Sequence, residues 1–295
     1  MVKNTVEKEK ISIVAGLPRT GTTFLYHNLQ KHPSVFVPYR KELAFFIYYY
    51  SKGIDWYLDH FSSMKPHQIG IDVSSIYLLH NFSIERIKDF NPDIKLIVGV
   101  RDPVEFALSM YAQANSYSFR LPSFEDFIIN YRFSRINDKL NIQLADNFVP
   151  RTLEKIQNAF GDNLLLYNYK FLKEDPLAIL KAIESFVEIP QYFNENNFDN
   201  VVINSGSRRH IKFVSSLLAT RDIYPRMLRA LFPESVIKAV KRRKDKAVSM
   251  EKCASMQSYP PEHIRLAEKV FAGQRNYFNN FFSKSQILLG SGTPF

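Results

Sequence analysis

The sequence of 295 residues has few of the features that mark secreted or membrane-spanning proteins. It contains a single cysteine, Cys253, so the chain cannot form an internal disulfide. The opening residues MVKNTVEKEK include no apolar stretch of the kind that a secretion signal carries. No apolar run approaches the roughly 20 residues that a helix needs to cross a bilayer. These absences predict a protein of the reducing cytoplasm that does not insert stably into a membrane.

The sequence also lacks the marks of a nucleic-acid-binding protein, although its net charge is +10. Such an excess of basic residues points to an anionic ligand, a nucleic acid or an acidic membrane surface. No RNA-binding module, zinc finger or basic zipper is present, and the aromatic residues follow apolar patterns rather than a basic stripe. The basic run at 238–246 is typical of a solvated helix face. We therefore expect a small anionic ligand and no nucleic-acid partner.

Short apolar runs alternate with helix-like patterns over the first two thirds of the chain, and 45% of all residues are apolar. Runs of strand length occur at 11–15, 35–37, 69–73, 96–100 and 164–167, and helical patterns at 22–31, 83–90, 103–113 and 175–187. This alternation predicts a parallel sheet with helices on both faces. We expect an α/β protein with a P-loop-like three-layer fold, in which a central parallel sheet is flanked by helices.

The remaining third of the chain has a helical and more basic pattern. We interpret it as a C-terminal helical appendage to a single domain that covers residues 1–295. In this interpretation an α/β core of about residues 10–190 is followed by a helical insertion at about 205–255 and a C-terminal helix at 260–283.

The stretch ISIVAGLPRTGTTFLYHNL, residues 11–29, predicts a buried strand, a glycine loop and a helix, which together form a cradle for phosphate. Gly16 and Gly21 occupy the glycine positions of a nucleotide-triphosphatase loop, but Thr22 stands where that loop has its lysine. The backbone N–H groups at the helix start bind an anion without that lysine. Arg19 supplies a cation before the second glycine, and Thr20, Thr22 and Thr23 add hydroxyl donors. Asp72 is the only candidate for the metal-binding carboxylate of a kinase.

A second candidate anion site follows the strand at 96–100. Arg101 comes directly after this strand, and Ser109 lies eight residues later in a helix that starts at a proline. Both side chains can reach the carboxyl edge of the sheet, where ligands of such folds bind. Two anion sites suit a nucleotide that is phosphorylated at two places.

Five ordered motifs resemble those of the sulfotransferases that use 3′-phosphoadenosine 5′-phosphosulfate (PAPS), in particular the heparan-sulfate type and its bacterial relatives. PRTGTTFLYHNLQKHPSV is similar to the donor loop P-[KR]-x-G-T-T, ELAFF to the acceptor segment E-x-x-F-F, and GIDWYLDHF to G-[IL]-x-W-Y. IGIDVSSIYL resembles the family's E-K-[ST]-x-x-Y-F strand, and RIKDFNPDIKLIVGVRDPVEFALSMY its N-P-x-x-[KR]-L…R-D-P-x-E-R-x-x-S-x-Y stretch. The likeness is nearly continuous from residue 11 to 111 and weaker to 190.

The resemblance implies an enzyme that binds PAPS, releases the bisphosphate product PAP and requires no metal. Glu42 would be the general base, with Lys41 beside it and Arg19 at the leaving phosphate. The residues implied for the donor are Arg19, Thr20, Gly21, Thr22, Thr23, Arg101, Ser109, and Arg208 or Arg209. Candidates for contact with an acceptor are Phe45, Phe46, Trp56, Asp72 and Tyr77, although for Trp56 packing in the core is the favoured interpretation. His32, His60 and His80 are weaker candidates for the base.

Two departures from the family pattern bear on the acceptor. Val73 replaces a lysine and Phe106 an arginine, so both changes remove cations. They favour a small-molecule acceptor over a highly sulfated glycan, because such glycans bind through many Lys and Arg contacts. A cell-surface saccharide or lipid stays open as the acceptor, and so do O- or N-sulfation and a monomer or homodimer. A small-molecule kinase and a basic binding protein without catalysis are the alternatives of other classes.

Overall fold

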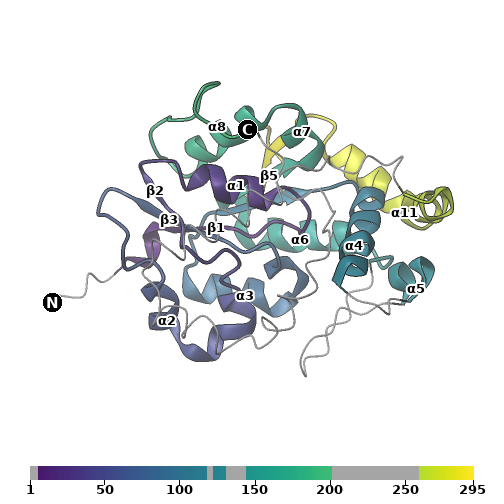
Figure 1. Cartoon of the computed structure of the whole chain (residues 1–295), viewed down its shortest axis with the longest axis horizontal. Coiled ribbons are helices and arrows are strands. Elements are labelled where there is room, and N and C mark those ends of the chain that lie inside the picture. The colour runs from purple at the N-terminus through teal and green to yellow at the C-terminus, as the bar shows by residue number, and fades with distance from the viewer. Residues whose placement is uncertain (1–5, 118–121, 131–143, 201–258) are drawn as a thin grey trace, which may run out of the picture. The chain divides into compact units, whose positions relative to one another are not determined.

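A six-stranded sheet lies at the centre of the protein in a computed structural model, which describes residues 6–117, 122–130, 144–200 and 259–295. The strands are β1 (Ile11–Val14), β2 (Val35–Phe36), β3 (Ile69–Val73), β4 (Leu96–Val100), β5 (Leu164–Asn168) and β6 (Ile287–Leu289). Their order is β2-β3-β1-β4-β5-β6. The first five strands pair in parallel and β6 pairs antiparallel to β5 (Figure 1). The predicted α/β fold with a central, largely parallel sheet is confirmed.

The strand order places the end of β1 at the middle of the sheet. Val14 of β1 pairs with Val73 of β3 on one side and with Ile97 of β4 on the other. The chain leaves β1 toward β2 and β3 and later crosses to β4, so the order reverses around β1. Ligands of open α/β sheets bind at such a reversal, outside the carboxyl ends of the strands.

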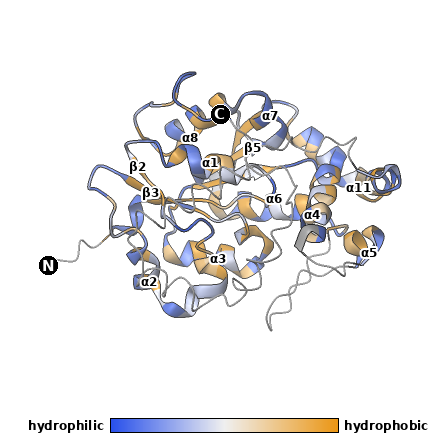
Figure 2. Cartoon of the chain, viewed as in Figure 1, coloured by the Kyte–Doolittle hydropathy of each residue, from blue (hydrophilic) through white to orange (hydrophobic). Residues whose placement is uncertain are grey.

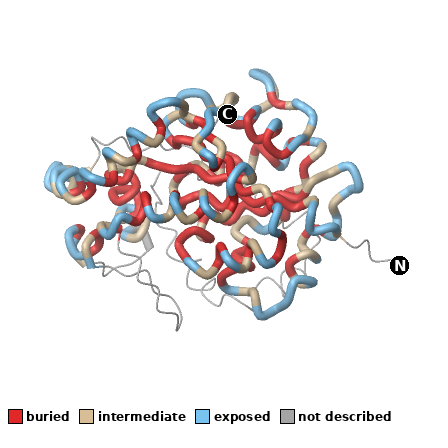
Figure 3. The backbone as a smooth tube through the Cα atoms, turned by 180° about the vertical axis from the view of Figure 1, so that it is seen from behind, coloured by how far each residue is buried: buried red, intermediate tan, exposed pale blue. Residues whose placement is uncertain are grey.

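Side chains of the strands alternate between two apolar cores, one on each face of the sheet. In β4, Leu96, Val98 and Val100 belong to the larger core, whereas Ile97 belongs to the smaller one. Because both faces are covered, the strands are mostly apolar rather than alternating with polar residues. Figure 2 shows the apolar residues along the strands, and Figure 3 shows the buried residues running through the middle of the protein.

The helices divide between these two cores. The first group packs on the larger core: α3 (Asn81–Phe90), α4 (Pro103–Tyr117), α5 (Phe124–Ile129), α6 (Phe148–Phe160) and α11 (Pro261–Phe281). The second group packs on the smaller core: α1 (Thr22–Leu29), α7 (Tyr169–Glu174) and α8 (Pro176–Phe186). Short elements complete the described chain: η1 (Lys8–Lys10), η2 (Phe45–Tyr49), η3 (Tyr50–Lys52), α2 (Ile54–Asp59), η4 (Tyr77–Leu79) and η5 (Gly161–Asn163).

Most predicted elements agree with the structure to within a few residues. The strand expected at 11–15 ends at Val14, the helix expected at 22–31 ends at Leu29, and the C-terminal helix expected at 260–283 covers Pro261–Phe281. The sequence reasoning missed α5, α6, α7 and β6. The predicted helical insertion at 205–255 and the basic run at 238–246 lie outside the described residues. Within the described residues, no helix combines the length and apolar character needed to cross a bilayer.

Candidate active site

The loop between β1 and α1 contains three residues with left-handed backbone conformations, two of which are glycines. Gly16 has φ 22°, Arg19 has φ 67° and Gly21 has φ 86°, all in the left-handed region that L-residues rarely adopt. At Gly21 an added Cβ would lie 2.3 Å from Cδ2 of Leu172 in α7, so the loop also passes close to that helix. The conformation at Arg19 is costly for a non-glycine residue and is typical of a functional turn.

Contacts with the neighbouring strands hold this loop in place. The Leu17 N–H donates to the Gly99 carbonyl of β4 at 3.2 Å. The Tyr167 hydroxyl of β5 donates to the Thr20 carbonyl at 2.9 Å. The Thr20 hydroxyl donates to the Leu17 carbonyl at 2.5 Å and Thr20 is fully buried. The Thr20 side chain therefore stabilises the loop itself, which differs from its predicted use as a hydroxyl donor to the ligand.

Among the described residues, α1, α4 and α7 are the helices that follow β1, β4 and β5, and of these α1 has no side-chain cap. Asp102 accepts from the N–H groups of Val104 and Glu105 at the start of α4, at 3.0 and 3.1 Å. Asn168 accepts from the Lys170 N–H at the start of α7, at 2.9 Å. Gly21 precedes α1 and supplies no such bond. The first turn of α1 is thus the helix start at this edge that best suits an external anion.

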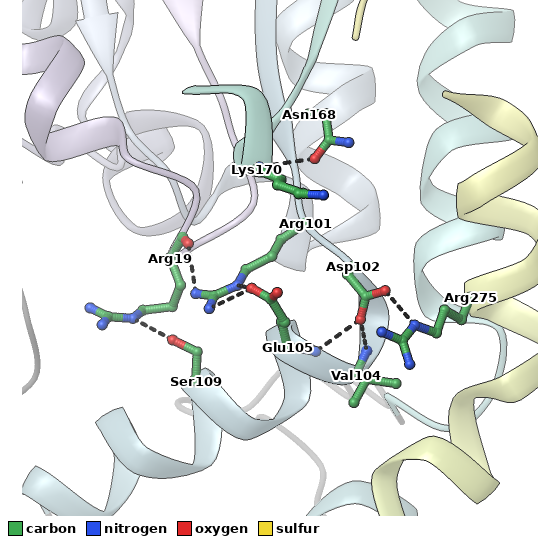
Figure 4. Close-up of polar contacts among 9 residues, drawn as sticks. All are labelled: Arg19, Arg101, Asp102, Val104, Glu105, Ser109, Asn168, Lys170 and Arg275. Atoms are coloured by element: carbon green, nitrogen blue, oxygen red, sulfur yellow. Dashed lines mark hydrogen bonds and ion pairs between the residues drawn. The ribbon is translucent and has the colours of Figure 1, made fainter. Parts of the chain in front are cut away.

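Two arginines and a serine meet beside this helix start, as Figure 4 shows. The Arg19 Nε donates to the Ser109 Oγ of α4 at 3.0 Å. The Arg101 Nη1 donates to the Arg19 carbonyl at 3.3 Å, and its Nε and Nη2 donate to Glu105 at 3.1 and 3.0 Å. The Arg101 guanidinium also lies over the Tyr169 ring, 4.8 Å from its centroid. The structure therefore brings together both cations and the serine that the sequence assigned to two separate anion sites.

A cleft of about 360 Å³ lies beside Arg101. Residues from the end of β5 and from α4, α7 and α11 line it, including Asp102, Lys170 and Arg275. The Arg275 Nε donates to Asp102 at 2.8 Å and so ties α11 to the cap of α4 (Figure 4). Neither Arg19 nor Ser109 lines this cleft. It adjoins the predicted anion site without coinciding with it.

Glu42 lies in the segment between β2 and η2, beside the end of β3. Its N–H donates to the Val73 carbonyl at 3.0 Å. Its Oε1 accepts from the Lys41 Nζ at 2.6 Å and from the Ser75 hydroxyl at 2.8 Å. Its Oε2 is buried, and among the described residues it has no hydrogen-bond partner. One carboxylate oxygen is thus held by two donors, and the other is a buried oxygen without a hydrogen-bond partner among the described residues, which is uncommon in folded proteins.

The backbone around Glu42 is strained. Glu42 has φ 60° and Ala44 has φ 54°, and neither is a glycine. Left-handed conformations of this kind cost on the order of 1–3 kcal/mol each and persist where the surroundings hold them. Backbone strain at Glu42, which lies beside the carboxyl end of β3, supports a functional role for this segment.

Four of the five predicted acceptor-contacting residues are buried. Phe45, Phe46 and Tyr77 are fully buried, and Asp72 is 1% exposed. They have no surface with which to touch an acceptor in this structure, so the prediction of direct contact is corrected to a role in the core. The fifth, Trp56, is half-buried, and Lys52 lies over its ring at 4.9 Å.

His32, His60 and His80, the weaker candidates for the base, all make contacts within the protein. His32 is buried, its Nδ1 accepts from the Ser34 N–H at 3.0 Å, and its Nε2 lies 3.1 Å from the Pro190 carbonyl. Burial lowers the pKa of His32. His60 bonds the carbonyl of Trp56 within its own helical turn, and His80 is buried beside the Phe82 ring. This geometry favours Glu42 over a histidine as the candidate base.

Sequence reasoning missed several residues of the site and placed others outside the described chain. The missed residues are Ser75, Glu105, Tyr167 and Tyr169. Three of them could have been found by the rule that indicated Arg101, since Ser75, Tyr167 and Tyr169 lie at or just after the carboxyl ends of strands. Arg208 and Arg209, predicted to contact a 3′-phosphate, lie outside the described residues.

Comparison with known proteins gives a family match. Residues 9–210 match the model of the sulfotransferase domain family. Heparan sulfate glucosamine 3-O-sulfotransferase 3B1 of Mus musculus is 29% identical over 188 residues, which cover 63% of this chain and 48% of that protein. The membrane-associated sulfotransferase kil1 of Dictyostelium discoideum is 37% identical over 102 residues, covering 34% of this chain and 22% of that protein. The chain thus spans at most about half the length of these relatives.

A solved structure shows a similar fold. The sulfotransferase from Alicyclobacillus acidocaldarius superposes with a TM-score of 0.54 at 18% identity, covering 72% of this chain and 91% of that one. At this level of identity the likeness supports the fold.

Proposed function

Since this chain belongs to the sulfotransferase domain family, we propose that it transfers a sulfonate group from PAPS to a hydroxyl or amine of an acceptor. The observation that carries this proposal is the convergence of Arg19, Arg101 and Ser109 beside the start of α1, which has no side-chain cap. A nucleotide with anions at its 5′ and 3′ ends matches such a pair of adjoining sites.

The residues of the site suit the donor. The first turn of α1 and Arg19 would hold the 5′-phosphosulfate, with Thr22 and Thr23 in the same turn. Arg101 and Ser109 would hold the 3′-phosphate, and Glu105, which now engages Arg101, would have to share that guanidinium. When bound, the donor supplies the sulfonate and departs as the bisphosphate. Arg19 would neutralise the negative charge that grows on the leaving phosphate.

Glu42 would take the proton of the acceptor. In our proposal the Glu42 carboxylate, whose side chain is 30% exposed, takes that proton, while Ser75 and Lys41 hold Oε1. General-base catalysis of this kind contributes typically about 10²–10⁴-fold in rate. Lys41, paired with Glu42 at 2.6 Å, would hold the carboxylate in place through a charge-assisted hydrogen bond.

A kinase is the less supported alternative. The loop has no lysine after Gly21, and Asp72, the carboxylate that such a kinase would use for magnesium, is buried and accepts from three hydroxyls. An aspartate in that state cannot also reach a metal ion at the loop.

The class of acceptor depends on whether Val73 and Phe106, which replace two cations of the family pattern, lie on the surface around Glu42. Val73 and Phe106 are 2% and 1% exposed, so side chains at these positions point into the core. In this chain neither position therefore contributes to the surface around Glu42. Relatives named for glucosamine 3-O-sulfation then favour a saccharide hydroxyl as the acceptor. A small metabolite is the second candidate.

Labelled sulfonate from PAPS tests the proposal. The protein is incubated with ³⁵S-PAPS and two acceptor panels, heparan-type saccharides and small hydroxylated or amine-bearing metabolites, beside Glu42→Gln. We expect transfer by the wild type and a loss of about 100-fold or more in Glu42→Gln, with unchanged affinity for PAP. No transfer to either panel together with no binding of PAP would contradict the proposal. Full turnover by Glu42→Gln would contradict the assignment of the base.

A further inference from the structure

Asp72 lies at the centre of a buried group of hydroxyls that contacts the strained segment carrying Glu42. We propose that Asp72 is a positioning residue, which fixes the backbone of residues 42–46 and thereby the orientation of the Glu42 carboxylate. This inference rests on the proposed function, in which Glu42 takes the acceptor proton. It replaces the sequence-based expectation that Asp72 touches the acceptor.

The first step concerns the bonds that Asp72 accepts. Its Oδ1 accepts from the Ser74 hydroxyl at 2.7 Å. Its Oδ2 accepts from the hydroxyls of Tyr77 at 2.7 Å and Tyr57 at 3.2 Å. All three partners donate to Asp72, and an ionised carboxylate is the group that only accepts. The carboxylate thus determines where each hydroxyl proton points.

The second step concerns what the same hydroxyls accept. The Ala44 N–H donates to the Ser74 Oγ at 3.2 Å, and the Phe45 N–H donates to the Tyr77 hydroxyl at 3.1 Å. A hydroxyl has one proton, so a proton directed at Asp72 leaves the oxygen lone pairs for these N–H groups. Asp72 therefore acts on the backbone of Ala44 and Phe45 through Ser74 and Tyr77.

The third step joins this backbone to Glu42. Glu42 and Ala44 have left-handed φ values of 60° and 54°, and such residues relax unless their surroundings hold them. The Glu42 N–H is bound to Val73, next to Asp72 in β3. The hydrogen bonds from the Ala44 and Phe45 N–H groups hold the same segment further along the chain. Losing them would let the segment relax and turn the Glu42 side chain.

The charged groups near Asp72 agree with a structural anion. The groups that face it are Tyr57 from α2, Tyr77 from η4, Ser74 from the end of β3, and the Glu42 carboxylate, which is paired with Lys41. Burial raises the pKa of Asp72 to about 6, with a smaller contribution from the Glu42 charge in the same direction. Near pH 7.5 Asp72 is therefore ionised, as its three accepted bonds require.

Asp72→Asn is the direct test, because its amide keeps the shape and reverses part of the hydrogen bonding. The Asn NH₂ group donates only, so a hydroxyl facing it loses the acceptor for its proton, and the proton must compete with the Ala44 or Phe45 N–H for the remaining directions around the oxygen. At pH 7.5 we expect kcat to fall by about 10- to 100-fold, with unchanged KM for PAPS and unchanged calorimetric affinity for PAP. Hydrogen exchange of the amides at 42–46 should quicken by about 10-fold or more.

Two further variants separate positioning from general stability. Glu184→Gln is the matched control, because Glu184 is a fully buried carboxylate that accepts from the N–H groups of Tyr192 and Phe193 in the other core. It should leave kcat and the exchange at 42–46 unchanged. Tyr77→Phe is the milder variant and should lower kcat in the same direction. The double variant with Asp72→Asn should be no worse than Asp72→Asn alone, because both act through one set of bonds.

The outcomes distinguish the inference from the proposed function. A kcat of Asp72→Asn within about twofold of the wild type with unchanged exchange at 42–46 would overturn the inference, and so would losses matched by Glu184→Gln. If the wild type transfers no sulfonate, the proposed function fails, and hydrogen exchange still decides whether Asp72 holds the segment. Faster exchange confined to 42–46, with kcat lowered and PAP affinity retained, would support both.

Discussion

Replacement of Arg101 by glutamine should remove the recognition of the 3′-phosphate while leaving the rest of the donor site in place. The Arg101 guanidinium is 8% exposed and is aligned by the Arg19 carbonyl, by Glu105 and by the Tyr169 ring. Hydrogen bonds to charged groups contribute about 1.5–3 kcal/mol each. Loss of one such contact to the phosphate corresponds to about 10- to 100-fold in affinity.

Calorimetric titration with two ligands measures how much the contact between Arg101 and the 3′-phosphate contributes to affinity. Adenosine 3′,5′-bisphosphate carries the 3′-phosphate, and adenosine 5′-phosphate lacks it. The wild type should bind the bisphosphate more tightly, and Arg101→Gln should lose about 10- to 100-fold for the bisphosphate with little change for the monophosphate. Arg151→Gln is the matched control for net charge, since Arg151 pairs with Asp146 on the surface of the protein.

The comparison of ligands makes this prediction refutable. If Arg101→Gln weakens both nucleotides equally, Arg101 supports the loop through the Arg19 carbonyl and does not recognise the 3′-phosphate. If the variant keeps the full preference for the bisphosphate, the 3′-phosphate binds elsewhere. Either result would contradict the assignment of Arg101.

Three further predictions follow from single contacts. Gly99→Ala places a Cβ 2.5 Å from the Tyr167 hydroxyl and 2.8 Å from the Thr20 Cβ. Urea unfolding should therefore show a free energy of unfolding lower by about 1–3 kcal/mol, and titration should show a weaker affinity for PAP. Gly273→Ala, whose added Cβ would meet nothing within 4 Å, should change neither quantity. Ser109→Ala removes the hydroxyl that bonds Arg19 and should weaken PAP by about 2- to 10-fold in the same titration. Burial raises the pKa of Asp72 from 3.8 to about 6 in the folded protein. The stability that this group contributes is therefore full below about pH 4 and falls by about 3 kcal/mol as the pH rises through 6. Urea unfolding measured from pH 4 to 7.5 should show this decrease in the wild type and not in Asp72→Asn.

The core of the fold could be predicted because its strands are buried on both faces. Such strands give largely apolar runs, and those predicted at 69–73 and 96–100 agree with the bounds of β3 and β4. The edge strand β6 has three residues and pairs antiparallel, so it gives no comparable run. Helix α6 carries an amphipathic pattern in FVPRTLEKIQNAF and could have been found from it.

The site could be predicted in part. The loop cations and Ser109 follow from their places after buried strands, and the structure brings them together. The turn at Glu42 could not be predicted, because its left-handed residues are Glu42 and Ala44 and no glycine signals them. For the same reason the burial of Phe45 was unforeseen: this turn directs the segment into the core, where its N–H meets Tyr77.

The most direct test of the account is a calorimetric titration of the wild-type protein with adenosine 3′,5′-bisphosphate beside ATP and magnesium. The account predicts that the bisphosphate binds more tightly, because the uncapped start of α1 and the Arg101 and Ser109 pair each take one of its phosphates. Tighter binding of ATP with magnesium would contradict the claim that this loop is built for a sulfonate donor.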